Sequence, residues 1–214
     1  MAIVWACPLS VDAYAAAGRD VEVPPAMCPA CAVLMSWWPG YWRFVREAGR
    51  CSQVFIRRGI CGTCGSTHAL LPAFLVRNRL DVVETIGTVV EAVTQRRSGV
   101  RPAADAADVP YTTARGWVRA FTLNAGRLAT GFAALAVELG SEITAGAVQS
   151  APGALGAIDA AWQVAASLPG WLALGRWRFC SAVCGGSLIA RNTNSPYLVV
   201  GRRRFMAPVP YRAT

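Results

Sequence analysis

The sequence predicts an α+β fold that is mainly α-helical, with short antiparallel strands near the N-terminus and alanine-rich helices in the second half. Three observations predict it. Aromatic and β-branched residues gather in the segments WWPGYWRFV and SQVFIRRGI, as in short strands. Apolar residues recur every three or four positions in DVVETIGTVVEAVTQ, as on one face of a helix. Alanine-rich segments after Phe121 predict further helices.

The chain divides into five parts by these patterns. The first is a lead-in segment, within which AYAAAG predicts a short helix that ends at Gly18. The predicted order is a lead-in segment at residues 1–27, a zinc ribbon at 28–75, a helix-turn-helix at 80–125, a helical C-terminal region at 126–190 and a basic tail at 191–214. Asp81 is the expected N-cap of the helix that follows it, with Glu84 in its first turn.

The charge indicates an anionic partner. The formal net charge is +9, and all 21 basic residues are arginine, which also fits the codon preference of a GC-rich genome. A polyanion gains counterion-release entropy when guanidinium groups replace its condensed cations, so nucleic acid or an acidic membrane surface is expected. The paired N–H donors of an arginine guanidinium group can form two hydrogen bonds to a phosphate or to the edge of a guanine.

The N-terminus and the apolar segments predict a cytoplasmic protein. MAIVWACPLSVD has no basic region before its apolar patch, so no secretory signal is expected. The longest uncharged run in the most apolar region, residues 160–175, is shorter than the about 20 residues that a spanning helix needs. We therefore expect no membrane span, reduced cysteines and, with DNA as partner, association with the nucleoid.

Two C-x-x-C pairs, CPAC and CGTC, are separated by 29 residues. Each pair can form a turn whose amides point at the sulfurs, and four thiolates complete a tetrahedral zinc site. The predicted ligands of this structural Zn²⁺ are Cys28, Cys31, Cys61 and Cys64.

Other uses of these cysteines fit the sequence less well than zinc binding. A thioredoxin-type redox site uses one C-x-x-C in a βαβ setting, and a reducing compartment disfavours disulfides. Four sulfurs close the zinc shell, so the site is expected to be structural and not catalytic. His68, the single histidine, could replace a ligand, but a position beside the ligands or in the core is the prediction. Buried thiols are expected for the other four cysteines.

The segment VRPAADAADVPYTTARGWVRAF predicts two short helices joined at DVP. Small and apolar residues at Ala103, Ala104, Ala107, Val109, Ala114 and Trp117 fit the register of a helix-turn-helix. Asp108 stands where glycine is common, and Asp tolerates the left-handed conformation. An ordinary helical hairpin with solvated arginines is the alternative.

The second of these helices, from Pro110 to about Phe121, is the predicted reading helix. Hydroxyls near its start and arginines one turn apart suit phosphates and base edges. Further arginines precede the helix pair and lie along the predicted ribbon. The predicted DNA-binding residues are Tyr111, Thr112, Thr113, Arg115, Arg119, Arg97, Arg101, Arg57 and Arg58.

Four strings carry a family resemblance: CPAC, WWPGYWRFVR, IRRGICGTCGSTHALLPAFL and GVRPAADAADVPYTTARGWVRAF. They resemble actinobacterial zinc-ribbon and helix-turn-helix proteins of uncharacterised function, which are related to the N-terminal DNA-binding regions of insertion-sequence transposases. The resemblance covers about residues 20–125, and THALLP and ARGWVRAF are its more specific parts. It implies a DNA-binding module of mobile elements, with the four cysteines as metal ligands.

The function predicted from these features is that of a zinc-stabilised protein that binds double-stranded DNA, either as an accessory factor in transposition or recombination or as a transcriptional regulator. The alternative is a scaffold that binds a transposase, integrase or polymerase without DNA specificity of its own. An enzyme is not expected. A nuclease core needs three carboxylates on a sheet, whereas the three acidic residues that follow the helix pair lie in alanine-rich segments predicted to be helical; they are Glu138, Glu142 and Asp159. Surplus apolar residues in the C-terminal helices predict a homodimer.

Overall fold

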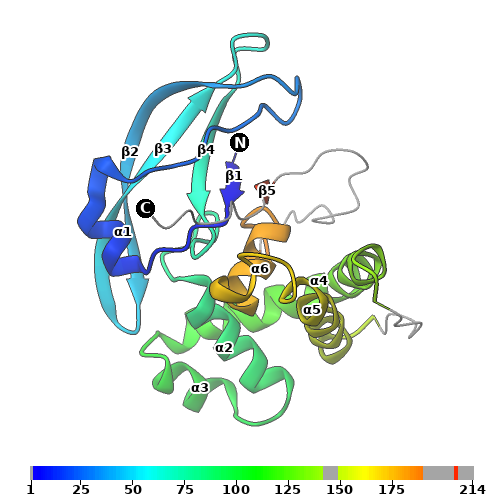
Figure 1. The fold of residues 1–214 in the computed structure, drawn as a ribbon. Helices are drawn as coiled ribbons and strands as arrows, with labels where there is room; N and C mark the ends of the chain where they lie inside the picture. The colour runs from blue at the N-terminus through cyan, green and yellow to red at the C-terminus, as the bar shows by residue number, and fades with distance from the viewer. Residues whose placement is uncertain (1, 142–148, 190–204, 207–214) are drawn as a thin grey trace.

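In a computed structural model of the chain, the structure describes residues 2–141, 149–189 and 205–206. The fold combines a mixed sheet with six α-helices among these residues (Figure 1). Along the chain the elements are β1 (Ala2–Trp5), α1 (Val11–Ala17), η1 (Gly18–Asp20), β2 (Ser36–Glu47), β3 (Arg50–Ile60), β4 (Thr67–Pro72), α2 (Val83–Thr94), α3 (Val100–Ala106), α4 (Tyr111–Glu138), α5 (Ala151–Ala165), η2 (Leu172–Leu174), α6 (Arg176–Val183) and β5 (Phe205–Met206).

The sheet has the strand order β2-β3-β4-β1-β5. The strands β2, β3 and β4 pair antiparallel, whereas β1 pairs parallel with β4 and with β5. All four residues of β1 are buried. The predicted lead-in segment is therefore an integral part of the sheet, because β1 lies between two other strands. The short helix predicted to end at Gly18 is present as α1.

The hairpin of β2 and β3 is longer than the short strands predicted for this region, with 12 and 11 residues. Its register shifts between Trp38 and Tyr41, where Pro39 and Gly40 intervene. A Cβ on Gly40 would lie 2.4 Å from the carbonyl oxygen of Ile56, so only glycine allows the two strands to pair this closely. The bulge therefore lets one long hairpin continue past a proline.

The helix α2 buries one face, as its periodicity predicts, with Ile86, Val89 and Val90 in the core. Its N-cap was predicted wrongly. Val82 is the N-cap and makes no side-chain capping bond, whereas Asp81 pairs with Arg46 on β2. The carboxylate is thus used to join the hairpin to the helices, and not to cap α2.

The helices α3 and α4 are joined by residues 107–110, and Asp108 has the predicted positive φ, 51°. Ala104, Ala114 and Trp117 are buried at this junction, as expected. The second helix does not end near Phe121. It continues as one helix of 28 residues to Glu138, because apolar residues follow Phe121 on the same face.

By length and composition, α4 is the one helix in the described part of the chain that could cross a membrane. Half of the relevant window is buried inside the fold, and core helices of soluble proteins pass the same test. The burial of Phe121, Leu128 and Phe132 against other elements accounts for its apolar character.

The C-terminal helices pack into the same core. The helix α5 begins at Ala151, since Ser150 caps it by accepting a hydrogen bond from the Gly153 amide and proline is tolerated in a first turn. The helix α6 carries Arg176, which pairs with Glu91 and Asp159, and Arg178, which pairs with Glu84. Most of the predicted basic tail lies outside the described residues, and Phe205–Met206 forms β5.

Candidate metal centre and basic helix face

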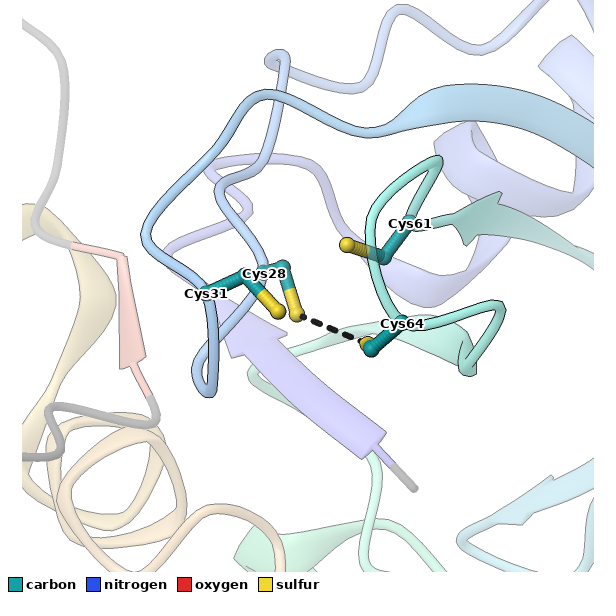
Figure 2. A group of neighbouring side chains, drawn as sticks. All are labelled: Cys28, Cys31, Cys61 and Cys64. Carbon is teal, nitrogen blue, oxygen red and sulfur yellow. Dashed lines mark hydrogen bonds between the residues drawn. The ribbon is translucent and has the colours of Figure 1, made fainter.

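The four cysteines of the two C-x-x-C pairs lie together (Figure 2). Cys28 and Cys31 come from the loop before β2, and Cys61 and Cys64 from the loop between β3 and β4. Their Sγ atoms all lie within 4.8 Å of one another. The prediction that the two pairs meet at one site is therefore confirmed.

The two loops have the same backbone geometry. The amide of Cys28 donates to the Val33 carbonyl, and the amide of Ala32 donates to the Cys28 carbonyl. In the second loop the amide of Cys61 donates to the Ser66 carbonyl, and that of Gly65 to the Cys61 carbonyl. The fourth residue after each leading cysteine has a positive φ, 54° at Ala32 and 67° at Gly65. Two equivalent turns thus face each other across the cluster.

The sulfur spacing fits a tetrahedral metal site. The Sγ atoms of Cys28 and Cys64 are 3.8 Å apart, far beyond the about 2.05 Å of a disulfide bond. Zinc–sulfur bonds of about 2.3 Å in a tetrahedron place neighbouring sulfurs about 3.8 Å apart. The donor set, four thiols and no carboxylate, is the one that zinc takes in closed structural sites.

Hydrogen bonds favour the thiolate form at the second pair. Bonds from the side chain and amide of Ser66 lower the pKa of Cys64 to about 6. Backbone hydrogen bonds at Cys64 and Thr63 lower the pKa of Cys61. In the first pair, sharing a hydrogen bond with Cys64 raises the pKa of Cys31 to about 12. A metal ion would take the place of the proton that the thiols share.

His68 lies beside the cluster, as predicted. Its ring is buried, and its Nε2 is 3.9 Å from the Sγ of Cys28. Burial lowers the pKa of His68, so the ring is neutral and can carry an N–H toward the sulfur. Its Nδ1 has no hydrogen-bond partner in the described part of the chain. With four thiols present, His68 supports a ligand and need not be one.

The cluster lies at one end of the β2–β3 hairpin, and the turn of the hairpin points toward α2 and α3 (Figure 1). The turn reaches the α3–α4 junction, where Gly49 lines a pocket together with Asp105, Asp108 and Pro110. A metal bound at the cluster would therefore fix the end of the hairpin that is remote from the helices.

Three of the predicted DNA-binding residues share one exposed face of α4. Thr112, Arg115 and Arg119 are exposed and spaced three and four residues apart, so they follow one side of the helix. Neither arginine has an ion pair among the described residues. Tyr111 and Thr113 are half-buried at the start of the same helix.

The other predicted arginines are placed differently. Arg101 lies over the ring of Tyr111, with its Cζ 4.7 Å from the ring centroid, and so adjoins the start of α4. Arg97 is paired with Glu91. Arg57 and Arg58 lie on β3, not on α4, and successive residues of a strand point to opposite faces of the sheet. They do not join the face of α4.

The arginines of β3 make structural contacts. Arg57 donates to the carbonyls of Arg19 and Val21, at 2.6 and 3.2 Å, and Arg58 donates to the Thr67 hydroxyl at 2.7 Å. On β2, Arg43 donates to the carbonyls of Val76 and Arg79. The arginines of the hairpin therefore stabilise the fold through hydrogen bonds as well as adding positive charge.

The sequence reasoning missed the exposed aromatic side chains of β2. Eight of the thirteen large apolar side chains that are exposed among the described residues fall between residues 27 and 44. They are Met27, Val33, Leu34, Trp37, Trp38, Tyr41, Trp42 and Phe44. The sequence does indicate this exposure. Successive residues of a strand point to opposite faces, so neighbouring aromatic residues cannot all face one core.

Fold and site together define a mixed α/β protein with a four-cysteine cluster suited to zinc. Residues 28–108 match the family model of a domain of unknown function (DUF6431). The matched segment runs from the first cysteine of the cluster to Asp108, so it is similar to this domain across both cysteine loops, the hairpin, α2 and α3. The description of that domain assigns it no activity or ligand. No match was found among curated proteins or among solved structures.

Proposed function

We propose that this protein binds double-stranded DNA, with α3 and α4 acting as a helix-turn-helix and the cysteine cluster acting as the structural zinc site of a ribbon. Its role is that of an accessory factor in transposition or recombination, or of a transcriptional regulator. The zinc has no catalytic role in this proposal, because four sulfurs leave no open position for water or substrate.

The observation that carries the proposal is the exposed face at the start of α4. From Tyr111 to Val137 the helix contains no acidic residue, and Arg115 and Arg119 stand unpaired on this face within the described chain. Thr112 and Gly116 lie beside them, and nothing lies within 4 Å of a Cβ added at Gly116. A polar, cationic helix face free of bulky neighbours is suited to the major groove.

Two nearby carboxylates do not belong to this face. Asp105 and Asp108 line the pocket that Arg46 and Gly49 also line, so they are directed toward the hairpin turn. This placement keeps their negative charge away from the phosphates that Arg115 and Arg119 would contact.

The alternative is a scaffold that binds a transposase or polymerase partner. The homodimer remains a prediction, although the apolar residues that suggested it, such as Leu155, Ile158 and Phe179, are buried within one chain. Salt dependence separates DNA binding from a scaffold role, since the logarithm of the affinity for DNA falls linearly with the logarithm of salt concentration.

The test uses DNA selected from a random pool by the full-length protein. Arg115→Ala and Arg119→Ala should each weaken binding by about tenfold and lower the salt slope by about one. Arg50→Ala is the matched control, because it removes the same charge from a side chain that is 68% exposed in the hairpin turn. Unchanged binding by both α4 variants, or an equal loss in the control, would reject the proposed reading helix.

A further inference from the structure

We propose that the face of the sheet bearing Trp37, Trp42 and Phe44 binds single-stranded nucleic acid by stacking on its bases. This surface is separate from α4, and the proposal does not depend on the duplex contact proposed above.

Strand pairing places these side chains together. Trp42 stands opposite Phe55, Phe44 opposite Gln53, and Trp37 opposite Gly59. Directly opposed residues of antiparallel strands share a face of the sheet, and so do alternate residues of one strand. The same rule places Arg57 of β3 on this face. Trp38 and Tyr41, opposite Arg58 and Ile56, lie on the other face.

The rings of the face are open to solvent. Phe44 is 60% exposed, Trp37 51% and Trp42 42%. They belong to β2, which is the edge strand of the sheet, so one side of each ring has no strand beside it. Side chains on one face of a strand stand about 7 Å apart along it. An extended single strand with splayed bases can follow such a row.

Two guanidinium groups stack within the row. The Cζ of Arg57 lies 5.5 Å from the centroid of a Trp37 ring, and that of Arg19 lies 5.4 Å from the Phe55 centroid. Phe55 in turn meets Trp42 edge to face, with centroids 5.3 Å apart. Two cation–aromatic pairs therefore lie on this face, and Phe55 connects one of them to Trp42.

The hydrogen bonds of Arg57 hold this row in place. Its Nε and one terminal nitrogen donate to the carbonyls of Val21 and Arg19, which fixes the guanidinium plane beside Trp37. A preorganised stack loses little side-chain entropy when a base is added to it. Arg57 therefore positions the face and supplies charge to it at the same time.

An anionic partner fits this face better than an apolar one. The chain carries a net charge of +9, and Arg19 and Arg57 bring cations into the row itself. Asp20 and Glu22, which flank Val21 in the sequence, are exposed and reduce the local positive charge. Aromatic rings interleaved with arginine are suited to stacking on bases along a charged backbone.

Single strands are favoured over duplexes because only unpaired bases present their flat faces. Gln53 lies opposite Phe44 and could contact a base edge, whereas the aromatic rings stack on any base, so weak sequence preference is expected.

The experiment measures binding of the full-length protein to fluorescein-labelled oligo(dT) of about 12 nucleotides, with a duplex of the same length for comparison. Oligo(dT) should quench the tryptophan fluorescence. Trp42→Ala and Phe44→Ala should each weaken its binding by about tenfold, whereas Trp42→Phe should retain most of it. Trp38→Ala is the matched control, as this ring is 45% exposed on the opposite face.

Three other results would each contradict binding of single-stranded nucleic acid at this face. Failure to bind oligo(dT), or an equal loss in Trp38→Ala, overturns the proposal. So does a protein that sediments as a dimer and becomes monomeric in Phe44→Ala without an effect on oligo(dT), since the face would then bind a second copy. Phe44 is exposed at a sheet edge, so its variant should fold even if Trp42→Ala does not. Arg115→Ala should leave oligo(dT) binding intact, which separates this test from the duplex test.

Discussion

Gly49 and Asp108 lie in contact although they belong to different parts of the fold. A Cβ added to Gly49 would stand 1.9 Å from the Oδ2 atom of Asp108. Both residues have positive φ, 76° and 51°, so one tight turn of the hairpin meets the tight turn between α3 and α4. Beside them, a hydrogen bond to Asp81 raises the pKa of Arg46 and holds the two parts together.

Gly49→Ala should destabilise the protein. The methyl group would collide with Asp108, and the left-handed backbone disfavours any residue with a Cβ. We expect a loss of about 1–3 kcal/mol in the free energy of unfolding, measured by urea titration. Gly156→Ala in α5 is the control. A Cβ there meets nothing within 4 Å, so this helix should gain up to about 1 kcal/mol. Equal effects of the two substitutions would contradict the contact.

Cys61→Ser should abolish zinc binding. Removing one of four thiolates opens the shell, and metal binding contributes directly to folding stability in sites of this kind. The wild-type protein should contain one zinc ion per chain by elemental analysis and should lose it in the variant, with a lower melting temperature. Cys51→Ser is the control, because Cys51 is exposed and lies outside the cluster. Retention of one zinc ion by Cys61→Ser would refute the site.

The two cysteine loops allow a paired test at Ala32 and Gly65. Both positions have a left-handed backbone, which costs a residue with a Cβ about 1–2 kcal/mol. Ala32→Gly should therefore stabilise the protein by about 0.5–1 kcal/mol, and Gly65→Ala should destabilise it by about the same amount. Denaturant unfolding of zinc-loaded protein gives both values. Changes of the same sign would show that the loops are not equivalent.

Arg178→Met should destabilise the protein by about 2–4 kcal/mol. The substitution leaves Glu84 without its ion-pair partner and removes the donor to the carbonyl of Leu9. The exposed pair of Arg50 and Asp12 is the comparison, because Arg50→Ala should change stability by less than about 1 kcal/mol. Both are measured by thermal unfolding. An unchanged melting temperature for Arg178→Met would show that these contacts of Arg178 with Glu84 and Leu9 do not stabilise the protein.

Sequence alone determined the features that depend on residues close together in the chain. The C-x-x-C pairs predicted a four-cysteine site because each pair builds its own turn and the chemistry of four thiols is specific. The spacing of Ile86, Val89 and Val90 predicted α2, and Asp108 predicted a left-handed turn. In each case the physical cause acts over a few residues.

Tertiary structure decided the features that depend on distant partners. The parallel pairing of β1 with β4 joins Ala2 to Ala69, and a four-residue apolar strand carries no mark of such a partner. The sequence also does not show which arginines form ion pairs, because their partners are distant in the chain. Arg46 and Arg178 are held by carboxylates far away in sequence, whereas Arg115 and Arg119 are left exposed. Residue type fixes the charge of a guanidinium, but only the fold determines whether it binds the protein itself or remains available to a partner.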